Sequence, residues 1–125
     1  MAATNVRVTE YQVSCLPQDG SARGWGGVFD VHVQWSGIGE LWAVRANGRV
    51  YDGECVEQYE PIPSERDDAF LARFRHDLQM ALMIAHAVAP FITINGTTAV
   101  QAAAGLAADL LERSADQIDP NENSD

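Results

Sequence analysis

The pattern of apolar and polar positions changes at residues 61–64, which read Pro-Ile-Pro-Ser. Before this point, apolar residues alternate with polar ones and glycine is frequent, a pattern typical of half-buried β-strands. After it, apolar residues recur every three or four positions and alanine becomes abundant, as in amphipathic helices. The pattern therefore predicts an α+β domain in which strands come first and helices second.

The strand region contains one clear alternating run and one clear hairpin. From Phe29 to Trp35 every second residue is apolar, so one face of a strand is predicted to be buried. Asn47-Gly48 favours a two-residue type I′ turn, because both positions adopt positive φ. With a strand inside residues 6–15 and a second hairpin strand running to about Gln58, we expect an antiparallel sheet of three to five strands. The hairpin register predicts a more exposed face made of Leu41, Ala43, Arg45, Val50, Asp52 and Glu54.

The second half of the chain predicts a long helix, a short strand and another helix. Ser64, followed three residues later by Asp67, resembles a capping box that begins a helix ending before Pro90. Residues 91–94 form a β-type run ended by a second Asn-Gly pair, and the sequence from Thr98 predicts a capped helix to about Arg113. The apolar stripe of the long helix consists of Phe70, Phe74, Leu78, Leu82, Ala85 and Ala89.

Length and charge limit the classes of function. The 125 residues, 46% of them apolar, fit one domain, predicted to cover residues 1–113. Eighteen acids face eight basic residues, all of them arginine, and the net charge of −10 disfavours binding to nucleic-acid backbones and to anionic membranes. Residues 114–125 are polar and acidic, which predicts a disordered tail.

The chain offers no strong signal for secretion, a membrane span or a cofactor. No apolar run reaches the roughly 18 residues of a membrane span, and the first residues lack the features of a secretion signal, so we expect a cytoplasmic protein. Cys15 and Cys55 are too few and too far apart for a zinc site, and we expect free, buried thiols. The histidines at 32, 76 and 86 lack metal-ligand spacing, so no metal or cofactor is expected.

Three groups of residues are candidates for contact with a partner. Trp25, between glycines, is either an exposed anchor or a cover for the sheet. Three arginines suit an acidic partner, or belong to an exposed helical face balanced by neighbouring acids. The helix from residue 80 to 89 is apolar on nearly all sides, which suggests burial between layers or between subunits. The arginines are Arg66, Arg73 and Arg75, and the oligomer candidates are Met80, Met83, Ile84 and Ala87.

A set of short segments spread over roughly residues 28–104 carries a resemblance to known sequences. The segments are Trp42-Ala43-Val44, residues 61–66, Phe74-Arg75-His76-Asp77, the alanines at 81, 85 and 89, Pro90, and Asn95-Gly96-Thr97. Together they resemble a family of small proteins of unknown function from actinobacteria and their phages. The absence of lysine agrees with the GC-rich genomes of that group. The resemblance implies no activity.

Three hypotheses about function follow. The leading one is a non-enzymatic phage accessory protein that binds a host protein or associates with itself. The second is an acidic mimic of DNA that occupies a nucleic-acid-binding host protein. The third is a small hydrolase, which needs His76 or His32 beside an acid in a pocket. The acids proposed for the mimic are Asp52, Glu54, Glu57 and Glu60, together with the tail.

Overall fold

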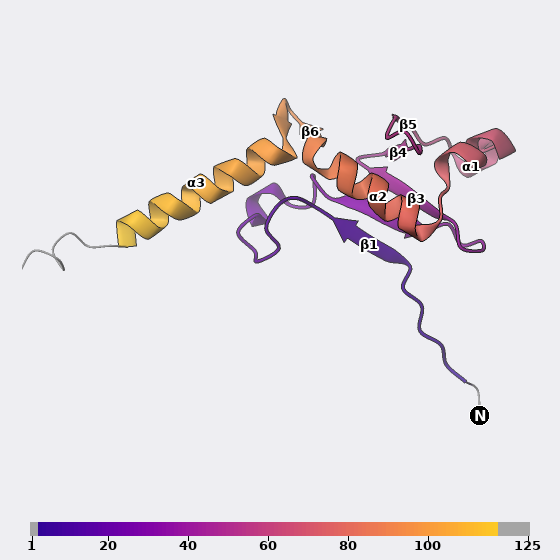
Figure 1. Ribbon diagram of the computed structural model, residues 1–125, viewed down its shortest axis with the longest axis horizontal. Helices are drawn as coiled ribbons and strands as arrows, with labels where there is room; N and C mark the ends of the chain where they lie inside the picture. The colour runs from indigo at the N-terminus through magenta and orange to yellow at the C-terminus, as the bar shows by residue number, and fades with distance from the viewer. Residues whose placement is uncertain (1–2, 118–125) are drawn as a thin grey trace, which may run out of the picture.

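A computed structural model describes residues 3–117 of the chain, and the side chains as far as Ser114. It confirms an α+β fold built on a five-stranded antiparallel sheet in the order β1-β2-β3-β4-β5, so that each strand pairs with the next along the chain. Helix α2 lies across this sheet, whereas α3 extends away from it (Figure 1). The strands are β1 (Glu10–Val13), β2 (Val31–Trp35), β3 (Trp42–Ala46), β4 (Arg49–Tyr51) and β5 (Glu57–Tyr59).

The hairpin between β3 and β4 has the predicted turn and register. Asn47 and Gly48 adopt φ of 52° and 78°, and Ala46 pairs with Arg49. The prediction that β4 runs on to Gln58 is wrong, because a tight turn after Asp52 starts a separate strand, β5. The Asp52 carboxylate holds this turn by accepting hydrogen bonds from the backbone N–H groups of Glu54 and Val56, both at 2.9 Å.

The main core lies between one face of the sheet and α2 (Leu78–Val88). The strands contribute alternate residues to this face, as the period-two pattern predicts. Val31, Val33 and Val44 are completely buried there. The helix contributes Ala81, Ile84, Ala85 and Val88.

The predicted continuous helix from Ser64 to residue 89 is wrong. A short 3₁₀ turn, η2 (Pro63–Glu65), is followed by α1 (Asp68–Phe74), and the chain then breaks before α2. The break is an extended segment in which His76 exchanges two backbone hydrogen bonds with Trp42, of 2.7 and 2.9 Å. Asp67 caps α1 and Asp77 caps α2, each accepting a backbone N–H at 2.8 Å. Both helix starts therefore follow the rule for N-caps, but neither uses Ser64.

The sheet face predicted to be exposed is partly buried, because α1 packs on it. Ala43 and Val50 are completely buried and Asp52 is 5% exposed. The rings of Phe70 and Phe74, stacked with centroids 4.8 Å apart, form a second apolar cluster with Val50. The break between α1 and α2 thus lets two consecutive helices cover opposite faces of one sheet. On the face that carries α1, Leu41 and Glu54 are exposed as predicted.

The C-terminal part follows the prediction closely. After η3 (Ala89–Phe91), strands β6 (Thr93–Ile94) and β7 (Thr97–Thr98) form a small hairpin around Asn95 and Gly96, with φ of 51° and 82°. Thr98 and Gln101 form the predicted capping box, with reciprocal bonds of 2.9 and 3.1 Å. Helix α3 (Ala99–Gln117) continues past the predicted end at Arg113, so the first residues of the predicted tail are helical. The remainder of that tail, residues 118–125, lies outside the described residues.

No helix within the described residues has the length and apolar character that crossing a membrane requires.

Candidate interaction surfaces

The three arginines predicted to bind a partner contact two of the four acids predicted to mimic DNA. Arg73 donates from Nε to Asp52 Oδ2 at 2.9 Å. Glu60 Oε1 accepts from Arg75 Nη2 and from Arg45 Nη2, both at 2.7 Å. Arg66 lies at the edge of this group, with Nε 3.8 Å from Glu60 Oε1 and 2.9 Å from the carbonyl oxygen of Pro61.

Glu60 is the centre of this cluster. Its side chain is 11% exposed and that of Arg75 is 5% exposed. Burial by itself raises the pKa of the Glu60 carboxyl, but the hydrogen bonds and charges of Arg45 and Arg75 outweigh it and bring this pKa to about 2. The cluster joins the end of β5 to β3 and to the segment between α1 and α2, so it holds together the side of the sheet that α1 covers.

The low pKa of Glu60 predicts loss of stability in acid. This pKa lies below the ordinary value of 4.5 that applies to the unfolded chain. The stabilisation that ionised Glu60 gives to the folded state is therefore complete above about pH 4.5 and is lost as the pH falls toward 2. The difference corresponds to up to about 3 kcal/mol. We expect urea unfolding at pH 6, 4 and 3 to show this loss, and Glu60→Gln to remove this part of the pH dependence.

The matched control is Glu54→Gln, which makes the same change at an exposed acid in the turn before β5. It should unfold in urea at neutral pH almost as the wild type does, because its side chain is exposed. A pH dependence that is the same in the wild type and in Glu60→Gln would show that Glu60 does not titrate as the structure requires.

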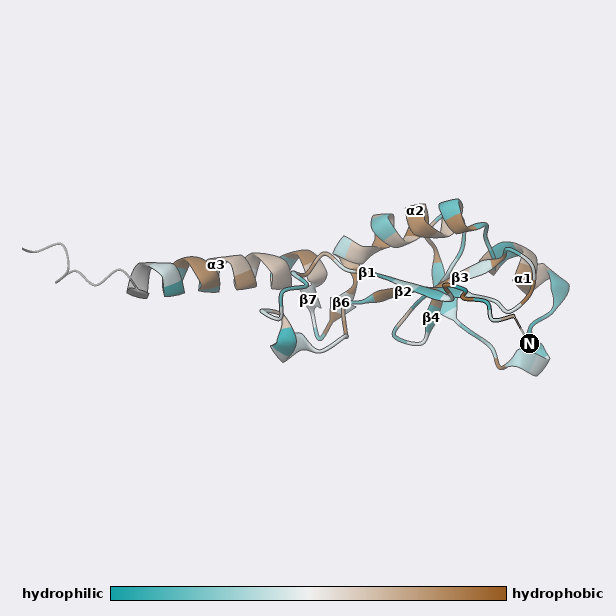
Figure 2. Ribbon diagram, turned by 90° about the horizontal axis from the view of Figure 1, so that it is seen from below, coloured by the Kyte–Doolittle hydropathy of each residue, from teal (hydrophilic) through white to brown (hydrophobic). Residues whose placement is uncertain are grey.

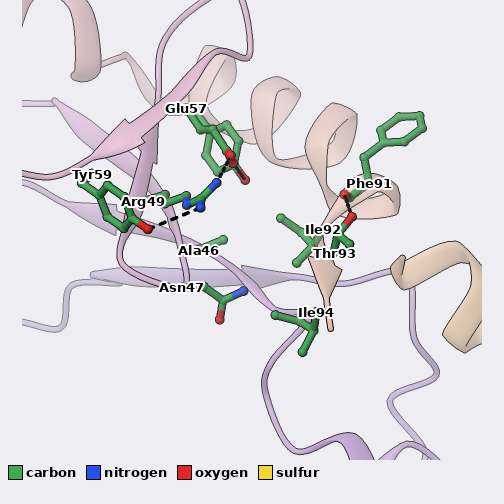
Figure 3. Close-up of a pocket in the computed structure, with 10 residues that line it drawn as sticks. Ala46, Asn47, Arg49, Glu57, Tyr59, Phe91, Ile92, Thr93 and Ile94 are labelled. Atoms are coloured by element: carbon green, nitrogen blue, oxygen red, sulfur yellow. Dashed lines mark hydrogen bonds and ion pairs between the residues drawn. The ribbon is translucent and has the colours of Figure 1, made fainter. Parts of the chain in front are cut away.

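A cleft lies beside the fourth and fifth strands. Helix α2 covers β2 and β3 and leaves the same face of β4 and β5 open, where a cleft of about 320 Å³ is bounded on its other side by residues 91–94. Figure 3 shows Arg49 in this cleft between Glu57 and Tyr59. The volume is at the lower end of the range for small-molecule sites.

The polar groups of this cleft are bonded to one another. Arg49 forms an ion pair with Glu57, and its guanidinium carbon lies 5.1 Å from the centre of the Tyr59 ring. The Tyr51 hydroxyl donates to Glu57 Oε2 at 3.1 Å. Burial, together with the charge of Glu57, raises the pKa of Tyr51 to about 12. A charged ligand would therefore have to break the ion pair between Arg49 and Glu57. For this reason we do not assign a ligand to the cleft.

Of the two interpretations of Trp25, an exposed anchor or a cover for the sheet, the structure supports the second. It lies in a short 3₁₀ turn, η1 (Arg23–Trp25), and is half-buried. Its ring meets Phe29 edge-on with centroids 5.2 Å apart, and it packs against the main core. The glycines around it therefore shape a loop that covers one end of the sheet.

The histidines and cysteines take structural or surface positions. His76 is 9% exposed and its Nε2 lies 3.1 Å from the carbonyl oxygen of Tyr51. His32 has Nδ1 3.5 Å from Glu10 Oε1. Both cysteines are free, as predicted, but only Cys15 is partly buried, whereas Cys55 is exposed in the turn between β4 and β5. Within residues 3–117, no group of three metal-ligating side chains comes together.

The predicted oligomer residues divide between the core and the surface. Ile84 is 2% exposed and belongs to the main core, so its assignment to a subunit interface is corrected. Met80, Met83 and Ala87 lie on the outer side of α2 and are exposed. The sequence from Asp77 to Asp109 contains no other Asp or Glu and no Arg or Lys. This uncharged stretch, unusual in a chain with net charge −10, covers α2, the small hairpin and the first half of α3.

Helix α3 leaves the domain after two turns. Ala99 and Ala102 are buried and Leu106 is partly buried against the main core, but every side chain from Ala107 to Ser114 is exposed. Figure 2 shows α3 standing out from the body with apolar residues along it. Four exposed residues spaced by four, three and four positions share one face of this helix. We name Val100, Ala104, Ala107 and Leu111 the α3 stripe.

The α3 stripe is a candidate contact surface that sequence reasoning missed. The sequence predicted the helix from Thr98 to about Arg113, but not that its second half would stand clear of the domain. Within the described chain, the stripe remains open: Val100 is 51% exposed and Leu111 is 72% exposed.

Comparison with known protein families, curated proteins and solved structures finds no match to this chain.

Proposed function

We propose that the protein is a non-enzymatic binding protein that contacts another protein chain through the α3 stripe. The observation that carries this proposal is a helix that leaves its own domain with apolar side chains exposed, Leu111 above all. In the setting that the family resemblance implies, it is a phage accessory protein that acts in the host cytoplasm on a host protein or on itself.

The projecting half of α3 is more favourable in a complex than alone. Helices shorter than about 12–15 residues are marginal in water without packing of an apolar face. From Ala107 onward α3 has no such packing on the described chain. A partner on the α3 stripe would supply it and would cover Leu111. The four residues of the stripe carry no charge, so a contact along them removes no charged side chain of the stripe from water.

The other two hypotheses have less support. A DNA mimic needs unpaired carboxylates, but Asp52, Glu57 and Glu60 each have an arginine partner. The small-hydrolase hypothesis needs a histidine with an acid in a pocket. His76 is buried against a backbone carbonyl, and the His32–Glu10 pair is the arrangement that an activity screen would address first.

Affinity capture from an actinobacterial lysate tests the proposal. The tagged chain is coexpressed with an untagged copy, so that capture of itself is also seen, and nuclease excludes bridging by nucleic acid. We expect the wild type to retain specific protein and Leu111→Asp to lose it. The matched control is Gly105→Asp, which adds the same charge on the opposite side of α3, where a Cβ meets no atom within 4 Å.

The pattern across the three chains decides the outcome. Retention by wild type and Gly105→Asp together with loss by Leu111→Asp supports a contact on the α3 stripe. The same proteins bound by all three chains, or none bound by any, would contradict the proposal.

A further inference from the structure

We propose that the occupant of the α3 stripe is a second copy of this chain, packed with its own α3 antiparallel. This inference rests on the proposed function and names its partner. It follows from the spacing of the stripe, from the net charge of the chain and from the exposure of Val100.

The spacing of the stripe is the same in both directions. Its steps of four, three and four residues place a two-fold axis between Ala104 and Ala107 when two helices run antiparallel. Val100 then faces Leu111 of the second copy, and Ala104 faces its Ala107. Large residues meet at both ends, while alanines at the centre let the helix backbones approach closely. The alternating spacing of four and three suits the shallow crossing angle of helix pairs, and the contact is self-complementary, as a two-fold dimer requires.

The net charge of the chain selects the antiparallel direction. Asp109 and Glu112 follow Gly105 by four and seven positions, so they lie on the side of α3 that faces away from the stripe, and the helix contact itself carries no acid. Only the first turns of α3 dock on the domain. A parallel pair would therefore place the two domains side by side, whereas an antiparallel pair places them at opposite ends of the paired helices. The net charge of −10 on each copy favours the arrangement that keeps the domains apart.

The stripe is accessible along its whole length, although the first turns of α3 dock on the domain. Val100 is 51% exposed between the buried Ala99 and Ala102, because it points about 100° away from Ala99 around the helix. The stripe spans roughly 17 Å of helix, so the contact is smaller than the roughly 800 Å² per partner of a standard interface. The dimer is therefore weak, with a dissociation constant on the order of micromolar or higher.

Sedimentation velocity on the full chain, from about micromolar to about millimolar concentration, tests this inference. We expect the wild type and Gly105→Asp to shift together from monomer to dimer as concentration rises. Leu111→Asp should weaken the dimer by at least about tenfold, since it places a new acid against Val100 of the partner. Leu111 is 72% exposed, and a circular dichroism spectrum confirms that each variant is folded.

Disulfide cross-linking tests the direction of the helices. In a Cys55→Ser background, which removes the exposed thiol, a Val100→Cys chain is mixed with a Leu111→Cys chain of different mass. An antiparallel pair predicts disulfides that join a Val100→Cys chain to a Leu111→Cys chain, and few disulfides between two copies of the same variant. Disulfides mainly within each chain type would show a parallel pair and overturn the proposed arrangement.

The results also separate this inference from the proposed function. A wild type that stays monomeric at every concentration overturns the dimer, even if a host protein is captured through the α3 stripe. A dimer that Leu111→Asp leaves intact places the contact elsewhere and overturns it as well. Failure of Leu111→Asp to change either self-association or capture would remove both proposals together.

Discussion

Glu60→Gln is expected to lower the free energy of unfolding by about 3–5 kcal/mol, the range for removing one partner of a buried ion pair. The substitution leaves Arg75, whose side chain is 5% exposed, without the carboxylate that accepts its hydrogen bond at 2.7 Å, and it also deprives Arg45. A buried cation without a counter-charge is costly. Urea unfolding at neutral pH measures the loss.

The matched control for Glu60 is Glu57→Gln. Glu57 pairs with Arg49 on the neighbouring strand, but the two side chains are 41% and 40% exposed, and exposed pairs contribute about 1 kcal/mol or less. Equal losses in the two variants would mean that burial of the arginine cluster does not determine its contribution to stability.

Phe74→Ala is expected to be the most destabilising apolar truncation on the α1 side, with a loss of about 3–5 kcal/mol. Phe74 is 1% exposed, stacks on Phe70 and closes the cluster above Val50. Removing its ring leaves a cavity between α1 and the sheet. Thermal or urea unfolding of the purified variant gives the value.

Leu71→Ala serves as the comparison for Phe74, because it lies on the same helix and is 37% exposed. Its effect should be clearly smaller, since fewer apolar contacts are removed. If Leu71→Ala destabilised the chain as much as Phe74→Ala, α1 would not pack on the sheet in the way described.

Features that depend on a few neighbouring residues were predictable from the sequence. The turns at Asn47-Gly48 and at Asn95-Gly96 are confirmed, as is the capping box of Thr98 and Gln101. In each case, the residues that signal the structure also make its hydrogen bonds or adopt its backbone angles. The alternation around Val31 and Val33 likewise identified the buried face of β2.

The break between α1 and α2 was not predictable from helical spacing, because the apolar stripe continues through residues 70–82 without interruption. The chain leaves the helix at His76 in order to pair with Trp42, a residue far away in the sequence. The only local signal was Asp77, which can cap a helix as well as continue one. The tertiary contact therefore decides between one helix and two.

The sequence interpretation wrongly expected charged residues to lie on exposed faces, whereas Asp52 and Arg75 are buried. Arg45 and Asp52 suggested an exposed face, and Arg73 and Arg75 an exposed helix, because each charge was considered alone. In the structure, Asp52 binds Arg73, and Glu60 binds Arg45 and Arg75. Such pairs satisfy one another and can be buried together. For α3, the sequence predicted the helix, but only the fold shows that it continues beyond the domain.

Amide hydrogen exchange along α3 tests most directly the claim that the α3 stripe is a contact surface for a second copy. The measurement compares the full chain at dilute and at high concentration, with the exposed turn around Cys55 as an internal reference. We expect amides from about residue 107 to 114 to exchange more slowly as concentration rises, while exchange in the reference turn does not change. Equally fast exchange of this part of α3 at every concentration would contradict it.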